Sequence, residues 1–300
     1  MPTDIHALCS LRDWVRWGAS QFNAAGLSFG HGADNALDES LNLVLHALHL
    51  DHSLPDSYLD CRVTEEEARD ILHLLLRRMQ ERLPAAYLTG RTWFAGLEFI
   101  VNPQVLVPRS PLAELIEQGF APWLEPEAIE RALDLCTGSG CIALAIAQYL
   151  PQAQVDGVDL SPAALEVAEL NRQRLELAEQ VQFYCADLYA GLPAEARYQL
   201  IISNPPYVAR EEYLGLAEEY RHEPRMGLEA ADAGLEIVIR ILRGAAQFLA
   251  PDGILIVEVG SSAETLQQRY PEVPFLWLEF ERGGDGVFLL SRQQLTDYPF

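Results

Sequence analysis

Four consecutive residues, Asn204, Pro205, Pro206 and Tyr207, have the clearest chemical potential in this sequence. They follow an apolar run at 200–203 with the composition of a buried strand. The two prolines remove two backbone donors and fix two φ angles, so the loop that ends this strand is stiff. The Asn204 side chain and a neighbouring free carbonyl can converge on a planar NH2 group, and Tyr207 can stack on the group that carries it. We therefore expect these four residues to be a catalytic loop, although the tetrapeptide alone also fits an ordinary strand-ending turn.

A glycine-rich turn lies upstream, between a short apolar run at 132–136 and an apolar stretch at 141–150 with helical composition. A strand, a glycine turn and a helix form the nucleotide-binding opening of a doubly wound α/β fold. The glycines let the backbone approach a ligand, and the start of the helix offers free N–H groups. The expected cofactor-binding residues of this turn are Cys136, Thr137, Gly138, Ser139 and Gly140.

Carboxylates follow the next two expected strands. The strand at 154–158 leads to Asp159, about twenty residues beyond the glycines, where a carboxylate can accept hydrogen bonds from ribose hydroxyls. The strand at 181–184 ends near Asp187 and Leu188, and a carboxylate there could accept from an adenine amino group. These residues extend the predicted cofactor site.

The order of these features favours methyl transfer over hydride transfer. The spacing from Gly138 to Ala143 also fits the fingerprint of NAD-dependent enzymes, so an oxidoreductase is an alternative of a different class. However, ligands of open α/β sheets bind at the carboxyl ends of the strands, where the Asn204 clamp would stand beside the nucleoside. A nitrogen clamp beside an adenosine-type cofactor predicts methyl transfer from S-adenosylmethionine. Asn204 would then border the cofactor as well as the acceptor.

The same motifs in the same order resemble the class I S-adenosylmethionine-dependent methyltransferases that modify planar amino nitrogens. The resemblance extends over most of the chain. The segments 84–90, 93–99 and 105–109 (PAAYLTG, WFAGLEF and VLVPR) are similar to the interdomain segment of the protein-glutamine N5-methyltransferases. That family implies a Rossmann-like, seven-stranded and mostly parallel sheet.

Two branches of this family methylate different proteins, namely peptide-release factors and ribosomal protein L-three of the large subunit. The release-factor branch typically has a Pro-Glu-Thr-Glu-like run after the arginine, whereas this chain has Ser110 and Pro111 there. These two residues, the DLCTGSGC form of the glycine turn, and the segments 219–224 and 274–280 are similar to the ribosomal branch. As a departure, 230–234 (AADAG) stands where relatives usually carry a Gly-x-Asp-Gly type turn. The resemblance implies N5-methylation of a glutamine in L-three, with a release factor as the alternative substrate.

The length of 300 residues allows about two domains. Residues 1–83 show apolar patterns of helical period at 11–22, 37–50 and 64–83, so we expect a small helical substrate-recognition domain there. Residues 84–109 are aromatic and β-branched with interspersed glycines, which predicts a β-hairpin linker. Residues 110–300 should form the α/β methyltransferase domain. Its later strands are expected at 253–259, 275–280 and 287–290.

The chain is strongly acidic, with a formal net charge of −23, and all 21 of its basic residues are arginine. Residues 101–300 carry 30 Asp and Glu against 13 Arg, a difference of −17. Such a chain is repelled by phosphate backbones, which disfavours free nucleic acid as a substrate and with it an adenine-N6 methyltransferase. A basic ribosomal protein would instead be steered towards it.

Other features bear on the compartment. No apolar run reaches the roughly 18 residues of a membrane span, so we expect no membrane partner. The segment 1–10 lacks the basic and apolar regions of a signal peptide. Five scattered cysteines do not suggest a disulfide framework, which favours a reducing cytoplasm.

Several further residues have two readings each. His46, His49 and His52 lie three apart on an expected helix, a spacing that could place metal ligands on one face, but no fitting further ligand is nearby, and we expect no metal. Cys136 and Cys141 are expected to be packing residues rather than redox-active thiols.

The roles of one residue and one segment near the expected site also remain open. Arg109 could anchor a substrate backbone or pair with an acid. The charged stretch 211–225, with Tyr213 and Tyr220, is expected to be a lid over the substrate, the alternative being a solvated loop.

Overall fold

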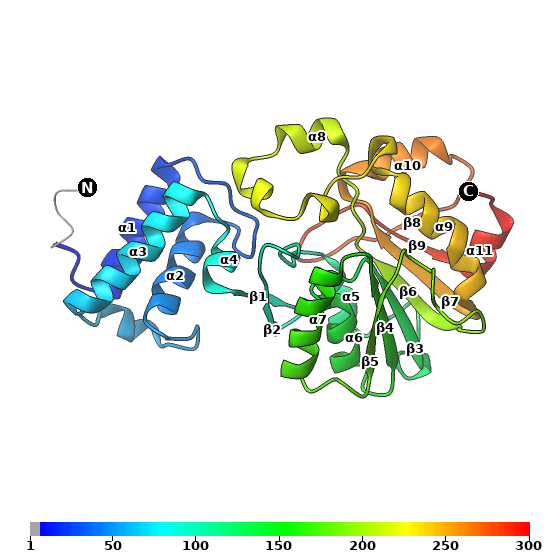
Figure 1. Cartoon of the computed structure of the whole chain (residues 1–300), viewed down its shortest axis with the longest axis horizontal. Coiled ribbons are helices and arrows are strands. Elements are labelled where there is room, and N and C mark those ends of the chain that lie inside the picture. Colours follow the sequence, from blue (N-terminus) through cyan, green and yellow to red (C-terminus); the bar gives the residue numbers. More distant parts are fainter. Residues whose placement is uncertain (1–6) are drawn as a thin grey trace. The chain divides into compact units, whose positions relative to one another are not determined.

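Residues 7–300 are described by the computed structural model and divide into two units (Figure 1). The first unit holds the chain up to Thr92 together with Ala217–His222, and the second holds Trp93–Leu216 and Glu223–Phe300. Residues 1–6, part of the segment considered for a signal peptide, lie outside the described residues. None of the helices found from residue 7 onwards combines the length and apolar character that crossing a membrane requires.

The first unit is helical, and its helices begin at side chains that satisfy free backbone N–H groups. Ser10 and Asp13 form a capping box for α1, Thr64 and Glu67 form one for α3, and Asn35 caps α2. The apolar faces of these helices pack into one core. The elements are α1 (Leu11–Ala24), α2 (Ala36–Ala47), the 3₁₀ helix η2 (Asp56–Asp60), α3 (Glu65–Glu81) and α4 (Ala85–Thr89).

The expected helix at 37–50 is shorter in the structure, which changes the reading of the three histidines. Helix α2 ends at Ala47, and His49 has a positive φ of 56°, so it and His52 lie beyond the helix. His46, His49 and His52 therefore do not share one helical face. Within residues 7–300, no group of three or more His, Cys, Asp or Glu side chains is arranged to hold a metal ion.

The segment Ala217–His222, which we expected within the methyltransferase domain, belongs to the helical unit. The Glu219 carboxylate is buried there: its Oε1 lies 3.5 Å from Arg78 Nη1 and 3.2 Å from Arg82 Nη2. Glu39 pairs with Arg78 at 2.7 Å, so two carboxylates face two guanidinium groups. A buried carboxylate separated from such partners would be strongly destabilising, and this network therefore fixes the segment in the helical unit.

A two-stranded sheet of β1 (Arg91–Phe94) and β2 (Leu97–Ile100) lies in the segment expected to form a hairpin linker. The boundary between the two units falls inside β1, between Thr92 and Trp93.

The second unit contains a seven-stranded sheet with the order β5-β4-β3-β6-β7-β9-β8. Strands β3 to β7 are parallel, and the last two are antiparallel, which confirms the expected fold class. The order reverses between β3 and β6, and open α/β sheets bind ligands at such a switch point. The strands are β3 (Arg131–Leu135), β4 (Gln154–Asp159), β5 (Val181–Cys185), β6 (Tyr198–Ser203), β7 (Leu249–Glu258), β8 (Leu276–Trp277) and β9 (Val287–Ser291).

The strand expected at 275–280 is the largest departure in this sheet. Only Leu276 and Trp277 pair with β9, and β8 is an edge strand. Very short edge strands are one way in which proteins protect a sheet from pairing with another chain.

Helices cover both faces of the sheet (Figure 1). One apolar core joins the sheet to α5 and α6, with α7 packed beside α6, and a second core joins the other face to α9, α10 and α11. The helices are α5 (Leu112–Glu117), α6 (Cys141–Tyr149), α7 (Pro162–Arg174), α8 (Arg210–Gly215), α9 (Glu236–Phe248), α10 (Ala263–Arg269) and α11 (Arg292–Asp297).

Candidate active site

Two neighbouring pockets lie where β3, β4, β5 and β6 end, and both are lined only by residues of the second unit. The larger has a volume of about 230 Å³ and the smaller about 120 Å³. Asn204, Leu106 and Gly227 line both of them. Asn204 is thus the residue of the expected catalytic loop that borders both spaces.

The glycine turn between β3 and α6 has the left-handed geometry that its composition predicts. Gly138 has a φ of 55° and Gly140 a φ of 79°. A Cβ atom on Gly140 would lie 2.9 Å from the Phe183 ring, so that position also has no room for a side chain.

Asp134 braces this turn from behind. Its Oδ2 accepts hydrogen bonds from Thr137 Oγ1 at 2.5 Å and from the Ala143 amide at 3.1 Å. Complete burial raises the pKa of Asp134 to about 7. Asp134 was not among the expected site residues, although an acid inside the apolar run at 132–136 is unusual.

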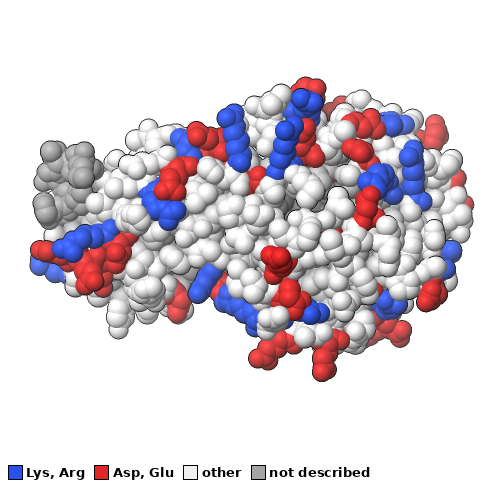
Figure 2. Space-filling view, in the orientation of Figure 1, with Lys and Arg blue, Asp and Glu red and all other residues white. Residues whose placement is uncertain are grey.

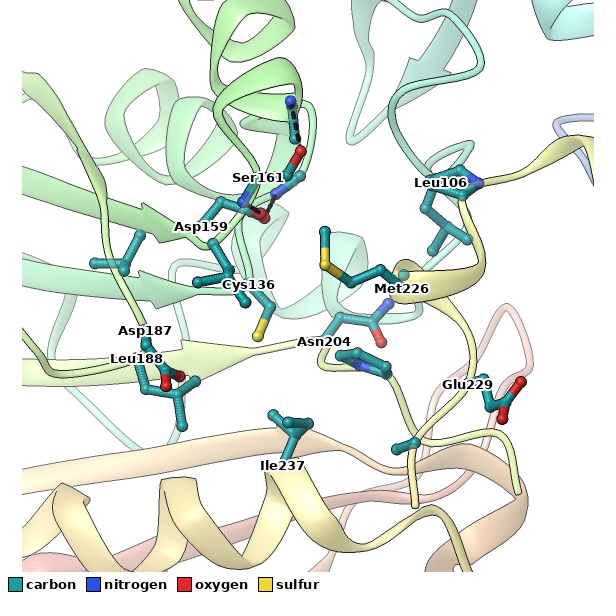
Figure 3. Close-up of a pocket in the computed structure, with 18 of the residues that line it drawn as sticks. Leu106, Cys136, Asp159, Ser161, Asp187, Leu188, Asn204, Met226, Glu229 and Ile237 are labelled. Carbon is teal, nitrogen blue, oxygen red and sulfur yellow. Dashed lines mark hydrogen bonds between the residues drawn. The ribbon is translucent and has the colours of Figure 1, made fainter. Parts of the chain in front are cut away.

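Asp159 lines the larger pocket, as predicted, and has a second contact that the sequence did not reveal. One carboxylate oxygen accepts from the Gly138 amide and the other from the Ser161 amide, both at 2.8 Å. The side chain therefore ties the glycine turn to the end of β4 (Figure 3). Burial raises the pKa of Asp159, while the backbone hydrogen bonds lower it. Each oxygen keeps a further lone pair for a ligand hydroxyl.

Asp187 and Leu188 also line the larger pocket. Asp187 Oδ2 accepts from Arg240 Nη2 of α9 at 2.7 Å, and both side chains are about half exposed. Exposed pairs of this kind contribute little to stability, so the Asp187 carboxylate can exchange its partner at low cost.

The expected cofactor residues separate into two groups. The structure places Cys136, Gly138, Asp159, Asp187, Leu188 and Asn204 around the larger pocket, and Ile237 and Met226 are among its other lining residues (Figure 3). It does not place Thr137, Ser139 or Gly140 there. Thr137 and Ser139 are buried, and Gly140 packs closely against the Phe183 ring.

The four residues of the expected catalytic loop are divided between the pockets. Pro206 lines the larger one, Pro205 and Tyr207 line the smaller one, and Asn204 lines both. The loop is fixed at its start, because Ser203 Oγ donates to the Leu135 carbonyl at 2.7 Å. It therefore acts as the partition between the two spaces.

Tyr207 is held on several sides. Its hydroxyl donates to Glu258 Oε1 at 2.9 Å, and its carbonyl accepts from Ser262 Oγ at 2.7 Å. A Cβ on Gly260 would lie 2.5 Å from the ring, and one on Gly234 would lie 2.1 Å from the carbonyl oxygen. Burial and the neighbouring Glu258 raise the pKa of Tyr207, so the phenol keeps its proton and remains a donor. The ring consequently forms a fixed wall of the smaller pocket.

Arg109 pairs with an acid, which is one of the two roles that the sequence left open. Its Nη1 and Nη2 each lie 2.7 Å from a carboxylate oxygen of Glu223, which also accepts from the Val107 amide at 2.9 Å. Arg109 lines the smaller pocket, so this bidentate pair closes one side of it.

The two cysteines near the turn have unreactive thiols, in agreement with a packing role. Burial raises the pKa of Cys141 to about 12 and raises that of Cys136 as well. Since the thiolate is the nucleophile, neither side chain is activated.

Several residues that shape the two pockets were not expected as site residues. They are Leu106, Ser110, Glu223, Met226, Arg240 and Glu258. Leu106, Ser110 and Glu223 lie in segments that carry the family resemblance, and Glu258 is an acid near the end of the strand expected at 253–259.

The sheet has the strand order of the class I methyltransferases, with an antiparallel final pair and two pockets at its switch point. A family model described as "Methyltransferase small domain" matches residues 118–223. The catalytic domain of hMettl16, solved in complex with a MAT2A 3′UTR hairpin, is 17% identical with a TM-score of 0.50 and covers 76% of this chain and 81% of its own, which shows the shared fold.

Curated relatives identify the family. The ribosomal protein uL3 glutamine methyltransferase of Xanthomonas campestris pv. campestris is 51% identical over 96% of this chain and 93% of its own length. The protein of the same name from Neisseria gonorrhoeae is 48% identical over 96% of each. The chain belongs to the ribosomal protein uL3 glutamine methyltransferase family. It is a methyltransferase, and its methyl donor is S-adenosylmethionine, as the sequence predicted.

Proposed function

We propose that this enzyme methylates the N5 amide nitrogen of a glutamine in ribosomal protein uL3. The position of Asn204 carries the proposal, because its side chain borders a nucleoside-sized pocket and a smaller one in which a single amide side chain can fit. The names of the relatives support the choice of acceptor.

The larger pocket holds the cofactor in this proposal. Gly138 allows the backbone to approach it, Asp159 accepts from the ribose hydroxyls, and Asp187 accepts from the adenine amino group. When bound, S-adenosylmethionine supplies a methyl group on a positively charged sulfur. The residues present fit such a ligand, since both carboxylates have acceptor capacity left and the turn has no side chain in the way.

The smaller pocket receives the glutamine amide. An amide nitrogen is a poor nucleophile because its lone pair is delocalised into the carbonyl group. Asn204 Oδ1 and the Pro205 carbonyl oxygen accept its two hydrogens and hold the nitrogen in line with the methyl group. The loop would thereby hold the amide nitrogen where a methyl group can be transferred to it, and the proton that the nitrogen loses would pass to water.

The partners follow from the charge. The net charge of −23 favours a basic ribosomal protein over free DNA or RNA. Figure 2 shows acidic and arginine side chains in small mixed groups on the visible face. The summed charge of the chain supplies the attraction in this proposal. We place the reaction in the cytoplasm, which the free cysteines support.

Methylation of purified uL3 tests the proposal. The enzyme is incubated with S-adenosylmethionine and either uL3 or a release factor, and the products are digested and analysed by mass spectrometry. We expect one additional methyl group on a glutamine side chain of uL3, and none with an Asn204→Ala enzyme. Methylation of the release factor alone would contradict the proposed acceptor, and transfer to neither protein would contradict the reaction.

A further inference from the structure

A buried carboxylate lies beneath the smaller pocket. Glu258, the last residue of β7, is 5% exposed and lines that pocket. Both of its oxygens accept hydrogen bonds, one from the Tyr207 hydroxyl at 2.9 Å and the other from Ser110 Oγ through a short contact. Burying a carboxylate is costly even with such bonds, so its presence beside a reaction site requires an explanation.

The two hydrogen bonds have different consequences for the site. Ser110 is buried and fixes the carboxylate from the side of the chain that leads to α5. Tyr207 links the carboxylate to the smaller pocket, because the Tyr207 ring forms one wall of that pocket. The ring has close contact with Gly260 on one side, and the bond to Glu258 fixes its hydroxyl end. Glu258 therefore holds the hydroxyl end of the ring that forms this wall.

We propose that Glu258 is a positioning residue for methyl transfer: through the Tyr207 hydroxyl it holds the ring against which the acceptor amide is oriented. This inference rests on the proposed function, since it assumes that the smaller pocket receives the amide. Its role is to accept hydrogen bonds, not to accept a proton from the substrate.

The molecule contains a matched pair of the same chemistry outside the site. Tyr198, at the other end of β6, donates from its hydroxyl to buried Asp156 at 2.7 Å. Arg131 also pairs with Asp156 at 2.7 Å, and neither Tyr198 nor Asp156 lines either pocket. Disturbing this pair changes the packing of the same sheet without touching the site.

The experiment compares Glu258→Gln, Glu258→Ala and the control Asp156→Asn. Turnover on uL3 gives kcat and KM, calorimetry with S-adenosylhomocysteine gives the cofactor Kd, and thermal melting reports folding. A fourth readout requires no substrate: the 13C resonance of the phenolic carbon of Tyr207, assigned with a Tyr207→Phe variant, reports the hydrogen bond directly.

We expect Glu258→Ala to shift the Tyr207 resonance and to lower kcat on the order of 10²-fold, the scale of a misplaced reacting group, with an unchanged cofactor Kd. Glu258→Gln keeps an acceptor for the Tyr207 hydroxyl, so its resonance should move little and its kcat should stay within about tenfold of wild type. Asp156→Asn should lower the melting temperature and leave kcat unchanged.

Three results would overturn the inference. The first is an equal loss of kcat in the Gln and Ala variants with an unmoved Tyr207 resonance in the Gln variant, which would make Glu258 a proton acceptor. The second is wild-type kcat in Glu258→Ala. The third is a Tyr207 resonance in Glu258→Ala that matches wild type, which decides the point even if wild-type enzyme fails to methylate uL3 and only the proposed function is lost.

Discussion

The two pockets that meet at Asn204 are constructed in different ways. The larger one has several lining residues at or just after strand ends, such as Cys136, Asp159 and Asp187, and the polar contacts of Asp159 are with backbone amides. The smaller one is closed by side chains that pair across long sequence separations, namely Arg109 with Glu223 and Tyr207 with Glu258. A binding pocket can thus be encoded locally, whereas the pocket that orients the acceptor depends on the completed fold.

The difference suggests separate tests for the two pockets. Substitutions in the smaller pocket should lower kcat and leave the cofactor Kd unchanged. Substitutions in the larger pocket should raise the cofactor Kd and leave kcat at saturating cofactor unchanged.

The largest effect is expected at Asn204. Asn204→Ala removes a preorganised acceptor at the reacting centre and should lower kcat by about 10²–10³, as measured by methyl transfer to uL3. Asn204→Asp keeps an acceptor and should retain partial activity, while Asn204→Leu should be worse than either because its bulk fills the pocket. The cofactor Kd of Asn204→Ala should stay close to wild type.

Asn204 also lines the larger pocket, so this variant tests whether the two pockets have separate roles. If Asn204→Ala weakens S-adenosylhomocysteine binding as much as it slows turnover, the residue serves the cofactor and not the acceptor. Wild-type turnover in the same variant would reduce the loop to a strand-ending turn.

The two carboxylates of the larger pocket should differ in importance. Asp159→Ala removes acceptors for the ribose and also releases the Gly138 amide, and it should weaken S-adenosylhomocysteine binding by about 1–3 kcal/mol in calorimetry. Asp187→Ala removes a half-exposed carboxylate and should cost less than about 1 kcal/mol. Neither should lower kcat at saturating cofactor.

The opposite ranking would show that the adenine end anchors the cofactor. Unfolding of Asp159→Ala in a thermal melt would show that the link between Gly138 and Ser161 is required for the fold itself.

The sequence predicted the larger pocket better than the smaller one. The strand ends and the glycine turn depend on local composition, and the structure brings Asp159, Asp187 and Asn204 together around the larger pocket. Glu258 and Glu223 could not be assigned, because a carboxylate becomes a partner only when the fold brings its donor close. The same limit applies to Glu219, whose burial in the helical unit depends on Arg78 and Arg82.

Capture of the acceptor should depend on salt more than cofactor binding does. The summed charge of −23 should raise the encounter rate with basic uL3, and salt screens it over a Debye length of about 8 Å at physiological ionic strength. We expect kcat/KM for uL3 to fall about tenfold from low salt to moderately high salt. The Kd for S-adenosylhomocysteine, measured over the same series, is the control and should change little. A flat kcat/KM would remove the steering argument.

The smallest effect concerns the turn that joins the two pockets, where relatives usually carry a different pattern of glycines. Ala231 lines the larger pocket, Gly234 packs against the Tyr207 carbonyl, and Ala233 between them has a left-handed φ of 56° and ψ of 36°. That conformation costs a residue with a Cβ roughly 1–2 kcal/mol, while glycine pays about 0.5–1 kcal/mol in unfolded-state entropy. Ala233→Gly should therefore stabilise the fold by up to about 1 kcal/mol, a rise in melting temperature of about 1–3 °C.

Ala231→Gly is the matched control for this change, because Ala231 has extended backbone angles (φ −72°, ψ −177°) that any residue adopts. Ala231→Gly should lower the melting temperature, because it raises the backbone entropy of the unfolded chain and relieves no left-handed strain. If Ala233→Gly also lowers it, the left-handed turn is not strained in this protein. If Ala233→Gly instead lowers kcat and weakens cofactor binding together, the rigidity of Ala233 maintains both pockets, and they cannot be treated as separately constructed sites.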